Sequence, residues 1–415
     1  MEIFFRKSLR EKSALIDQYL FHQRNKTSLG EVSTPRRLRE KLLDLVPQRF
    51  WCSPRRVLEP AVGCGGLLID VIERFFEGMR EYEPDDKKRY ALILKNIYYI
   101  DINPDNVEIC DKLLEAPSNG LVADALAIDP VAHWNIEGGF DMVVGNPPYN
   151  KAGTKKNGAI IWHKFVKGAL SSWLADDGYL LFIHPPLWRM PSSPRGRTLG
   201  LFDLMTHKNQ LHELRIVDKN AGSRLFKAGH AFDYYLIEKG VCYANTRVCN
   251  KNGSALLDMR EYEWLPNDHY EKIRALTGLD CQPLLHNTRH RQGTPSEKTE
   301  INKYPLLYRM SRKYGRGITY LPKKDDQFFF GVPKVIISLT SKFAVINDFE
   351  GEYGICEHIV AFAINTEEEG DRIAEFFLSN DYAELHEAIK FSYIAVAPHT
   401  MKQLCTDFWF KYRRD

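Results

Sequence analysis

The chain has 415 residues, of which 44% are hydrophobic and 27% charged, and its formal net charge is +3. This is the composition of a globular protein with a sizeable core, and it excludes collagen-like, mucin-like and wholly disordered chains. At roughly 100–200 residues per domain, the length predicts two or three domains. The N-terminus carries charges throughout, and no run of about 18 apolar residues occurs, so we expect neither a signal peptide nor a membrane span.

The cysteines indicate the cellular compartment, and the charge distribution indicates the kind of partner. The eight cysteines are scattered and form no C-x-x-C pair, which indicates reduced thiols in a cytoplasmic protein rather than a zinc ribbon or a disulfide scaffold. We expect no metal site. Residues 285–345 hold twelve Lys or Arg and four Asp or Glu, a net charge of +8, whereas the remainder carries −5. Such a basic segment favours a polyanion partner, although basic runs are also common on solvated surfaces.

The expected elements alternate between strand and helix. Residues 1–50 look helical, with apolar side chains near helical spacing. Strands are expected at 56–60, 96–102, 121–126, 140–149, 178–186, 210–218 and 230–240, and helices at 67–76, 103–116 and 162–174. This alternation predicts an α/β fold with a doubly wound, mostly parallel sheet over about residues 50–240. After Gly240, apolar runs at 334–339 and 358–365 predict a mixed α+β domain. The expected domains are therefore 1–50, 51–245 and 246–415.

A glycine-rich turn joins the first expected strand to its helix, in the order Glu59-Pro60-Ala61-Val62-Gly63-Cys64-Gly65-Gly66. Glycines let a ligand approach the backbone closely, and a helix N-terminus offers unpaired N–H groups. An ordinary tight turn between a strand and a helix has the same appearance. The absence of G-x-x-x-x-G-K-[ST] argues against a P-loop nucleotidase. Glu59 would repel phosphates, so it favours a cationic ligand.

Acidic residues end the next two expected strands. Asp101 lies where a carboxylate accepts hydrogen bonds from ribose hydroxyls, although Asp101 or Asn103 could instead cap the following helix. Asp124 ends the third expected strand. There it could accept a hydrogen bond from an adenine amino group or have a purely structural role.

The fourth strand ends at Asn146-Pro147-Pro148-Tyr149. In open α/β sheets, ligands bind outside the carboxyl ends of the strands. The prolines fix the backbone and hold the Pro147 carbonyl near the Asn146 side chain, so two acceptors point at one place beside an aromatic face. This arrangement suits an NH₂ group on a planar base. A proline-rich turn is the alternative, but it would not explain the register with the three preceding motifs.

Taken in this order, the motifs resemble S-adenosylmethionine-dependent amino-methyltransferases, and specifically the gamma class of N6-adenine DNA methyltransferases, over residues 30–240. Ser33-Thr34-Pro35 resembles the N-terminal motif that reaches the methionine moiety. The resemblance implies S-adenosylmethionine as the cofactor and a Rossmann-like methyltransferase sheet. The cofactor contacts that it implies are Thr34, Glu59, Ala61, Gly63, Gly65, Asp101, Ile102, Asp124, Ala125 and Phe165.

The resemblance also implies the remaining functional residues. Asn146, Pro147 and Tyr149 correspond to the catalytic segment, and Tyr149 and Phe226 to the aromatic side chains that stack on a flipped-out adenine. The cofactor turn precedes the catalytic segment without room for a recognition domain between them, which is the gamma order. The C-terminal region is therefore expected to recognise the DNA target, with Arg312, Lys313 and Arg316 as candidate DNA contacts.

Other functions remain open at this stage. An RNA amino-methyltransferase or a protein glutamine methyltransferase would use a similar acceptor pair, and a catalytically silent DNA-binding protein could share the scaffold. The expected partner is double-stranded DNA, with no membrane. We expect a monomeric, cytoplasmic protein of bacterial or viral origin. No nuclease signature is apparent, so any cognate restriction endonuclease would be a separate protein.

Overall fold

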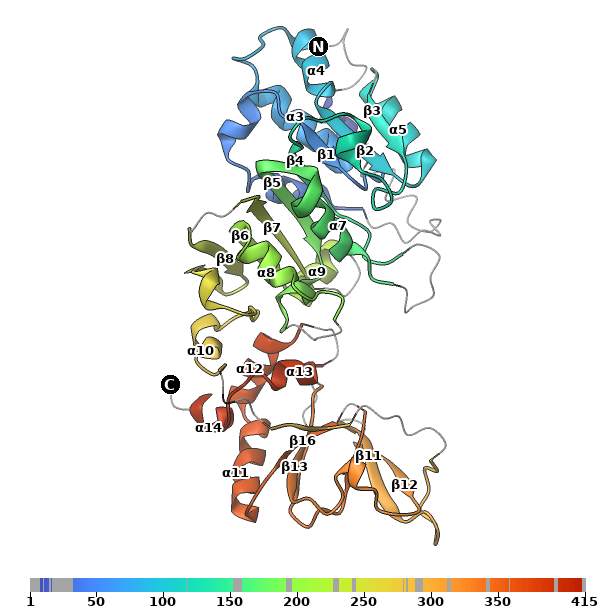
Figure 1. The fold of residues 1–415 in the computed structure, drawn as a ribbon, viewed down its shortest axis with the longest axis vertical. Coiled ribbons are helices and arrows are strands. Elements are labelled where there is room, and N and C mark those ends of the chain that lie inside the picture. Colours follow the sequence, from blue (N-terminus) through green and yellow to red (C-terminus); the bar gives the residue numbers. More distant parts are fainter. Residues whose placement is uncertain are drawn as a thin grey trace. The chain divides into compact units, whose positions relative to one another are not determined.

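The computed structural model describes residues 8–9, 11–14, 16, 33–116, 118–151, 159–191, 196–226, 231–240, 244–278, 280, 283–287, 294–311, 315–340, 344–357, 359–391 and 395–412. The chain divides into two compact units, the first within residues 1–188 and 194–263 and the second within 189–193 and 264–415. Figure 1 shows the elements of both units in chain order. None of the described helices is long and apolar enough to cross a membrane.

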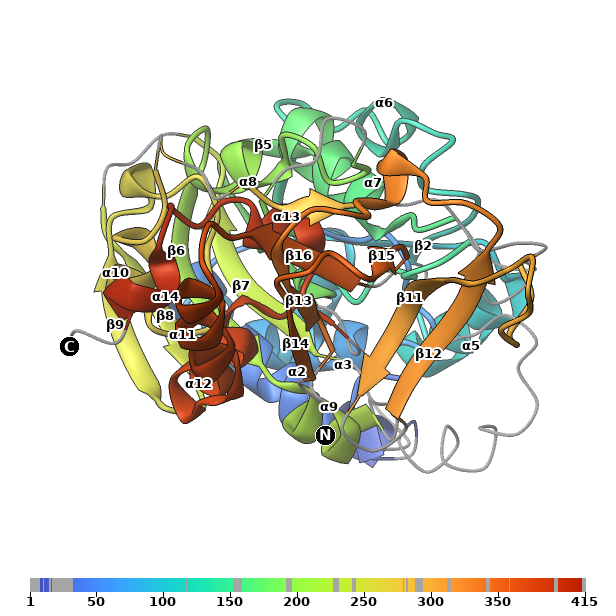
Figure 2. The same ribbon diagram turned by 90° about the horizontal axis from the view of Figure 1, so that it is seen from below.

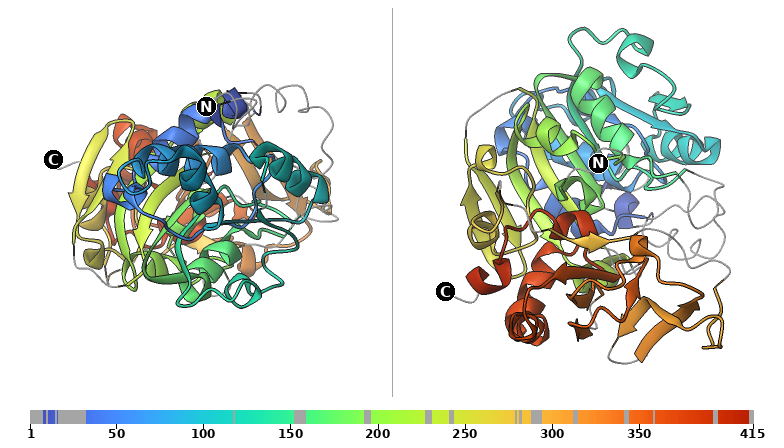
Figure 3. Two further views of the ribbon diagram at one scale, coloured as in Figure 1. Left: turned by 90° about the horizontal axis from the view of Figure 1, so that it is seen from above. Right: turned by 60° about the horizontal axis from the view of Figure 1, so that its bottom comes forward.

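The first unit is built on a nine-stranded sheet with the order β3-β2-β1-β4-β5-β7-β6-β8-β9, seen from three sides in Figure 1 and Figure 3. The strands are β1 (Val57–Glu59), β2 (Ile97–Asp101), β3 (Asn119–Val122), β4 (Phe140–Gly145), β5 (Leu174–His184), β6 (Gln210–Val217), β7 (Phe232–Glu238), β8 (Thr246–Asn250) and β9 (Gly253–Leu257). Strands β3, β2, β1, β4 and β5 are mutually parallel, whereas β7 runs antiparallel to both of its neighbours.

Helices cover both faces of this sheet. One face packs against α2 (Arg36–Leu43), α3 (Gly66–Gly78), α4 (Asp86–Leu94) and α5 (Pro104–Leu114), whose apolar side chains share a core with alternate strand residues. Trp162 of α7 (Trp162–Gly168) stacks on His184, which follows the core residue Ile183 and therefore points to the opposite face. The other segments are α6 (Pro130–His133), a π-helical turn (Ala169–Trp173), α8 (Leu201–Thr206), α9 (Lys219–Phe226) and 3₁₀ turns at Gln48–Cys52, Pro186–Arg189 and Met259–Glu261.

The second unit combines two small sheets with helices. One sheet has the order β10-β16-β13-β14 and the other β12-β11-β15, and Figure 2 shows most of these strands from below. The elements are α10 (Tyr270–Arg274), β10 (Leu285–His286), β11 (Tyr304–Ser311), β12 (Gly315–Leu321), a 3₁₀ turn (Asp326–Phe328), β13 (Lys334–Ser338), β14 (Val345–Asp348), β15 (Gly354–Ile355), β16 (Ile359–Ala363), α11 (Glu367–Leu378), α12 (Asn380–Ile389), α13 (Pro398–Met401) and α14 (Phe408–Lys411).

The expected α/β fold class is confirmed, while several elements differ from their expected bounds. The third strand ends at Val122 rather than at residue 126, because the Asp124 carboxylate accepts a hydrogen bond from the Leu126 N–H and turns the chain there. The first compact unit continues through β8 and β9 to residue 263, because β8 pairs with β6 and so extends the first sheet. The parallel pairing of β8 with β6 could not be read from local residue patterns.

Candidate active site

The site lies where the chain order of the sheet changes direction. Strands β1 and β4 are neighbours, with Leu58 opposite Val143, but the chain leaves β1 toward β2 and leaves β4 toward β5. In open α/β sheets, such a switch point opens a crevice at the carboxyl ends of the two strands. Glu59 ends β1, and Asn146 follows the last residue of β4. The topology therefore brings the two motifs to the same edge, although they are far apart in sequence.

The glycine-rich turn leaves space at one position and is tightly packed at another. Gly63 and Gly65 have φ angles of +53° and +80°, a region that favours glycine. A Cβ at Gly65 would lie 2.8 Å from the Cys110 Sγ, so α5 closes that side of the turn. A Cβ at Gly63 would meet no atom within 4 Å. The turn is thus open to a ligand at Gly63, and α3 begins directly after it at Gly66.

Glu59 is a buried acid with an unsatisfied oxygen. Its side chain is 3% exposed, and Oε2 has no hydrogen-bond partner among the described residues. Burial raises the pKa of Glu59 well above its ordinary value; the Arg39 charge acts in the opposite direction, while Asp101 and Asp70 raise the pKa further. A buried carboxylate without a partner is unfavourable. A cationic or hydrogen-donating ligand at this oxygen would remove that penalty.

Asp101 supports the turn in addition to being a candidate ligand contact. Its Oδ2 accepts a hydrogen bond from the Gly63 N–H at 2.8 Å, and its Oδ1 accepts one from the Asn103 N–H at 2.8 Å. Helix α5 is capped by Asn103, whose side chain accepts from the Asp105 N–H. Asp101 therefore does not serve as the helix cap. It links the end of β2 to the glycine-rich turn.

The other expected cofactor contacts differ in exposure. Ile102, directly after β2, is 62% exposed. Asp124 and Gly63 are at least partly accessible, and so is Ala61. Ala125 and Phe165 are buried, and the Phe165 ring packs edge-on against Trp173.

The Asn146-Pro147 segment presents two acceptors. The Asn146 Nδ2 donates to the Thr34 Oγ1 at 3.1 Å, and the Asn146 Oδ1 is buried without a partner among the described residues. No donor within the described part of the chain reaches the Pro147 carbonyl either. Because β4 ends at Gly145, this carbonyl lies beyond the sheet ladder. Two neighbouring acceptors thus lack donors at the carboxyl edge of the sheet.

The two aromatic side chains expected to hold a base have different neighbours. Tyr149 is half-buried, and burial raises its pKa, with the nearby Asp233 charge adding to the effect. Asp233 is fully buried and accepts a hydrogen bond from the Trp188 Nε1 at 2.8 Å. Phe226, the last residue of α9, is also half-buried, and its ring lies 5.1 Å from that of Phe232 in an edge-on arrangement.

A buried network behind Thr34 was not expected from the sequence. Arg39 is 1% exposed, donates from Nη1 to the Thr34 carbonyl at 2.7 Å, and pairs through Nε with the Asp70 Oδ2 at 2.5 Å. Ser13 donates to the other Asp70 oxygen at 2.6 Å and accepts from the Arg39 Nη2 at 2.9 Å. A signal for it exists in the sequence, because Asp70 interrupts an otherwise apolar helix face.

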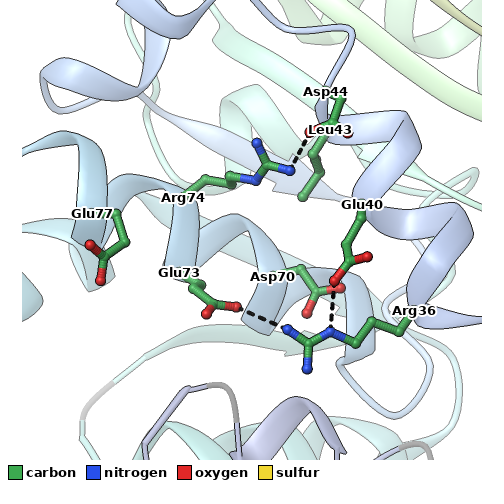
Figure 4. Close-up of a pocket in the computed structure, with 8 residues that line it drawn as sticks. All are labelled: Arg36, Glu40, Leu43, Asp44, Asp70, Glu73, Arg74 and Glu77. Atoms are coloured by element: carbon green, nitrogen blue, oxygen red, sulfur yellow. Dashed lines mark hydrogen bonds and ion pairs between the residues drawn. The ribbon is translucent and has the colours of Figure 1, made fainter.

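A pocket of about 350 Å³ lies between α2 and α3, with Asp70 in its lining (Figure 4). Its charged side chains pair with one another within α2 and between α2 and α3. Arg36 contacts Glu40 and Glu73, and Arg74 contacts Asp44. The pocket is therefore a charged contact between two helices, and it does not coincide with the acceptors at the sheet edge.

In the second unit, cations lie beside aromatic rings on the β12-β11-β15 sheet. Arg316 is exposed and donates to the Tyr353 hydroxyl at 3.1 Å, with its guanidinium 5.7 Å from that ring. The Lys303 amine lies 5.5 Å from the Tyr304 ring, and the Arg309 guanidinium lies 6.0 Å from the Tyr308 ring. The candidates Arg312 and Lys313 lie outside the described residues. The described part of this sheet combines positive charge and aromatic surface.

Comparison with known proteins connects this architecture to DNA modification. Residues 119–223 match the family described as Eco57I restriction-modification methylase. The modification methylase CviBIII of Paramecium bursaria Chlorella virus NC1A is 27% identical over 169 residues, which are 39% of this chain and 38% of that protein. The match thus spans well under half of the relative's length. The resemblance to DNA modification methylases inferred from the motifs is confirmed over this region.

Two solved structures share the fold over most of the chain. One is a nuclease-deletion mutant of the Type ISP restriction-modification enzyme LlaGI in complex with a DNA substrate mimic, with a TM-score of 0.53 at 12% identity over 89% of this chain and 53% of that one. The other is a DrdV–DNA complex, with a TM-score of 0.51 at 11% identity over 97% of this chain and 58% of that one. At these identities the likeness concerns the fold.

Proposed function

We propose that this chain is a DNA methyltransferase that transfers a methyl group from S-adenosylmethionine to N6 of adenine. The observation that carries the proposal is the pair of buried, unsatisfied acceptors at the ends of adjacent strands, the Glu59 Oε2 and the Asn146 Oδ1. Buried acceptors normally have partners. Here both lie at the switch point of the sheet, and each matches a donor group that this reaction supplies.

The residues at the edge of β1 and β2 fit the cofactor. The Glu59 carboxylate would bind the ammonium group of its methionine part, and Gly63 leaves room for close approach to the backbone. Asp101 retains lone pairs for a ribose hydroxyl after accepting two backbone N–H groups. The exposed Ile102 offers an apolar surface to the adenine ring. When bound, the sulfonium of the cofactor supplies an electrophilic methyl group.

The Asn146-Pro147 segment would grip the target amino group. The Asn146 Oδ1 and the Pro147 carbonyl would accept its two N–H bonds, which directs the nitrogen lone pair toward the methyl group and stabilises the positive charge that develops on N6. Positioning and electrostatic preorganisation then carry the catalysis. No strong base is required before transfer, because the methylated, positively charged nitrogen is very acidic.

The target base must leave the duplex to reach this segment. Tyr149 and Phe226 would replace the lost stacking, at about 1–3 kcal/mol for each contact between a base and an aromatic ring. Lys303, Arg309 and Arg316 would contact the DNA backbone, together with Arg312 and Lys313. DNA is favoured over RNA or protein because the curated relative is a modification methylase and because the basic, aromatic sheet suits a nucleic acid.

The proposal extends to the form in which the protein acts. We propose a monomer that modifies DNA in the cytoplasm, in a bacterial or viral context, with any cognate endonuclease on a separate chain. If the protein needed a separate specificity or nuclease subunit, the purified chain alone would not methylate DNA, and adding the second protein would restore activity. Light scattering of the purified chain with and without duplex DNA would measure the stoichiometry directly.

An assay with radiolabelled S-adenosylmethionine tests the central proposal. Labelled methyl groups should enter double-stranded DNA but not RNA or protein, and single-molecule sequencing of DNA from expressing cells should place them on adenine N6 within one short sequence. Label in RNA or protein would favour an alternative amino-methyltransferase. Binding of DNA without incorporation of label would favour a catalytically silent specificity protein.

A further inference from the structure

We propose that Thr34 is a positioning residue, whose hydroxyl contacts the Asn146 side-chain amide and holds it at the edge of the sheet with Oδ1 toward the target amino group. The inference deepens the proposed function and rests on it. It assigns to Thr34 a role in addition to the cofactor contact implied by the sequence resemblance. The structural basis is the contact between the Thr34 Oγ1 and the Asn146 Nδ2, which links two segments 112 residues apart at 3.1 Å.

The orientation of the amide matters because its two ends have opposite hydrogen-bonding character. An asparagine oxygen only accepts and its nitrogen only donates. The target amino group donates both of its hydrogens, so an Asn146 turned by 180° would place donor against donor. With Nδ2 bound to Thr34, the buried Oδ1 is the end left for the substrate. The contact with Thr34 thus restrains the Asn146 side chain in the arrangement that leaves its oxygen for the substrate.

The position of Thr34 is itself fixed by buried groups. The Arg39 Nη1 donates to the Thr34 carbonyl at 2.7 Å, and Arg39 is held by its pair with Asp70. The Arg39 and Asp70 side chains are 1% and 5% exposed, so water competes little for these bonds. Thr34 also lies two residues before α2, which begins at Arg36. Its hydroxyl is therefore presented from a firmly anchored backbone.

The Thr34→Val variant tests the inference, because valine has nearly the same shape and lacks the hydroxyl. At saturating cofactor and DNA, we expect kcat to fall about 10-fold, the scale of one lost hydrogen bond. Thr34→Ser keeps the hydroxyl and should restore most of kcat. Thr246→Val is the matched control, since Thr246 is a buried threonine of the same unit whose Oγ1 donates to the Leu211 carbonyl at 2.6 Å. It should leave kcat unchanged.

A double-mutant cycle separates orientation of Asn146 from other roles of Thr34. In the Asn146→Ala background there is no amide to orient, so Thr34→Val should then cost almost nothing in kcat. A role confined to cofactor binding would raise the KM for the cofactor by the same factor in both backgrounds. Non-additive kcat values are therefore specific to the proposed contact.

A binding measurement gives a readout that does not depend on turnover. The probes are two duplexes with the sequence found methylated in cells, one with adenine and one with unsubstituted purine, which lacks the amino group, at the target position. Because purine pairs more weakly and flips out more cheaply, the preference is measured as the ratio of the two affinities, and Thr34→Val should shift this ratio several-fold toward purine relative to the native protein. Equal kcat and an unchanged preference in Thr34→Val would overturn the positioning role, provided that the native protein methylates adenine. Failure of the native protein to methylate adenine would overturn the proposed function instead.

Discussion

Two buried carboxylates, one in each unit, are treated in opposite ways. Asp348 in the second unit is 4% exposed and is fully engaged: its Oδ2 pairs with the Lys334 Nζ at 2.7 Å and accepts from the Tyr353 N–H, and its Oδ1 accepts from the Glu352 N–H. Glu59 in the first unit is 3% exposed, and its Oε2 has no hydrogen-bond partner in the described part of the chain. The same chemical group is satisfied in one place and left unsatisfied in the other.

Asp348 is buried for a structural reason, whereas the burial of Glu59 favours a ligand at its side chain. The Lys334–Asp348 pair holds the turn that leads to Tyr353, and Tyr353 in turn accepts a hydrogen bond from Arg316. The Lys334–Asp348 pair would therefore affect DNA binding only indirectly, through the shape of the β12-β11-β15 sheet. The Glu59 side chain makes no hydrogen bond through Oε2 to any described residue, so its burial makes sense when a ligand supplies the donor. Substitution of Asp348 should therefore lower the stability of the second unit, whereas substitution of Glu59 should weaken ligand binding without loss of stability.

The largest expected effect is on the stability of the second unit. Asp348→Ala leaves the Lys334 amine buried without its counter-charge, and breaking such a pair costs about 3–5 kcal/mol. Hydrogen exchange of the β13 amides should report this loss as easier opening of the unit. Lys334→Met combined with Asp348→Leu removes both charges and should recover the part of the loss that comes from the unpaired charge, while the Glu352 and Tyr353 N–H groups stay without their acceptor. A full loss in the double variant would show that the pair is not what stabilises the turn.

Asn146→Ala should give the next largest effect, on catalysis instead of stability. Removing one preorganised acceptor typically costs about 100–1,000-fold in rate. Cofactor affinity should change much less, because Glu59 and the glycine-rich turn remain. Asn150, an exposed asparagine four residues further along, provides the matched control, and Asn150→Ala should keep nearly full activity. Near-normal methylation by Asn146→Ala would reduce the Asn-Pro-Pro-Tyr segment to a structural turn.

Much of the first unit could be predicted from local patterns, because its strands, turns and motifs follow one another in a regular alternation. The glycine-rich turn, Asp101 and Asn146 were each placed correctly at a strand end. Contacts between distant segments could not be predicted in this way. The bond between Thr34 and Asn146, the Arg39–Asp70 pair and the pairing of β8 with β6 all depend on how elements pack, and no single-sequence period encodes them.

The second unit was less predictable for a related reason. Its strands are short and pair across long sequence separations, such as β10 with β16. The basic character of residues 285–345 indicated a polyanion partner, but not that Arg316 would lie against Tyr353 on a three-stranded sheet. The charge of a segment can be read from its composition without knowledge of the fold, whereas the geometry of a binding surface cannot.

Glu59→Gln should weaken cofactor binding and remove its pH dependence. The pKa of Glu59 is raised in the folded protein, so the free protein binds a proton there more tightly than the unfolded chain does. The stability of the ligand-free native protein should therefore fall as the pH rises from about 4.3, the pKa of a glutamate in the unfolded chain, through the higher pKa of Glu59 in the folded protein. A cationic ligand requires the carboxylate, so cofactor affinity should rise over the same window, with release of a proton. Calorimetry in two buffers of different ionisation enthalpy measures that release.

The glutamine variant has the same shape without the charge. It should bind the cofactor about 10-fold or more weakly, since hydrogen bonds to charged groups contribute about 1.5–3 kcal/mol. Its affinity should be flat with pH, and the free variant should be at least as stable as the native protein at neutral pH. A native-like pH dependence in Glu59→Gln would assign the titration to another group and would leave Glu59 without the proposed role.

The smallest expected effect is on DNA affinity. If Arg316 contacts a phosphate, Arg316→Ala should reduce the slope of log affinity against log salt concentration by about 0.9, because one fewer counterion is released on binding. The loss should be similar for all DNA sequences, since phosphate contacts carry no sequence information directly. Lys402→Ala, at an exposed lysine outside the three-stranded sheet, should leave the slope unchanged.

Tyr353→Phe removes the hydroxyl that accepts the Arg316 hydrogen bond and keeps the ring. It should weaken binding by less than Arg316→Ala without changing the slope, because the charge remains and only its orientation is lost. A slope unaffected by Arg316→Ala would mean that the aromatic and basic sheet of the second unit is not the DNA-binding surface.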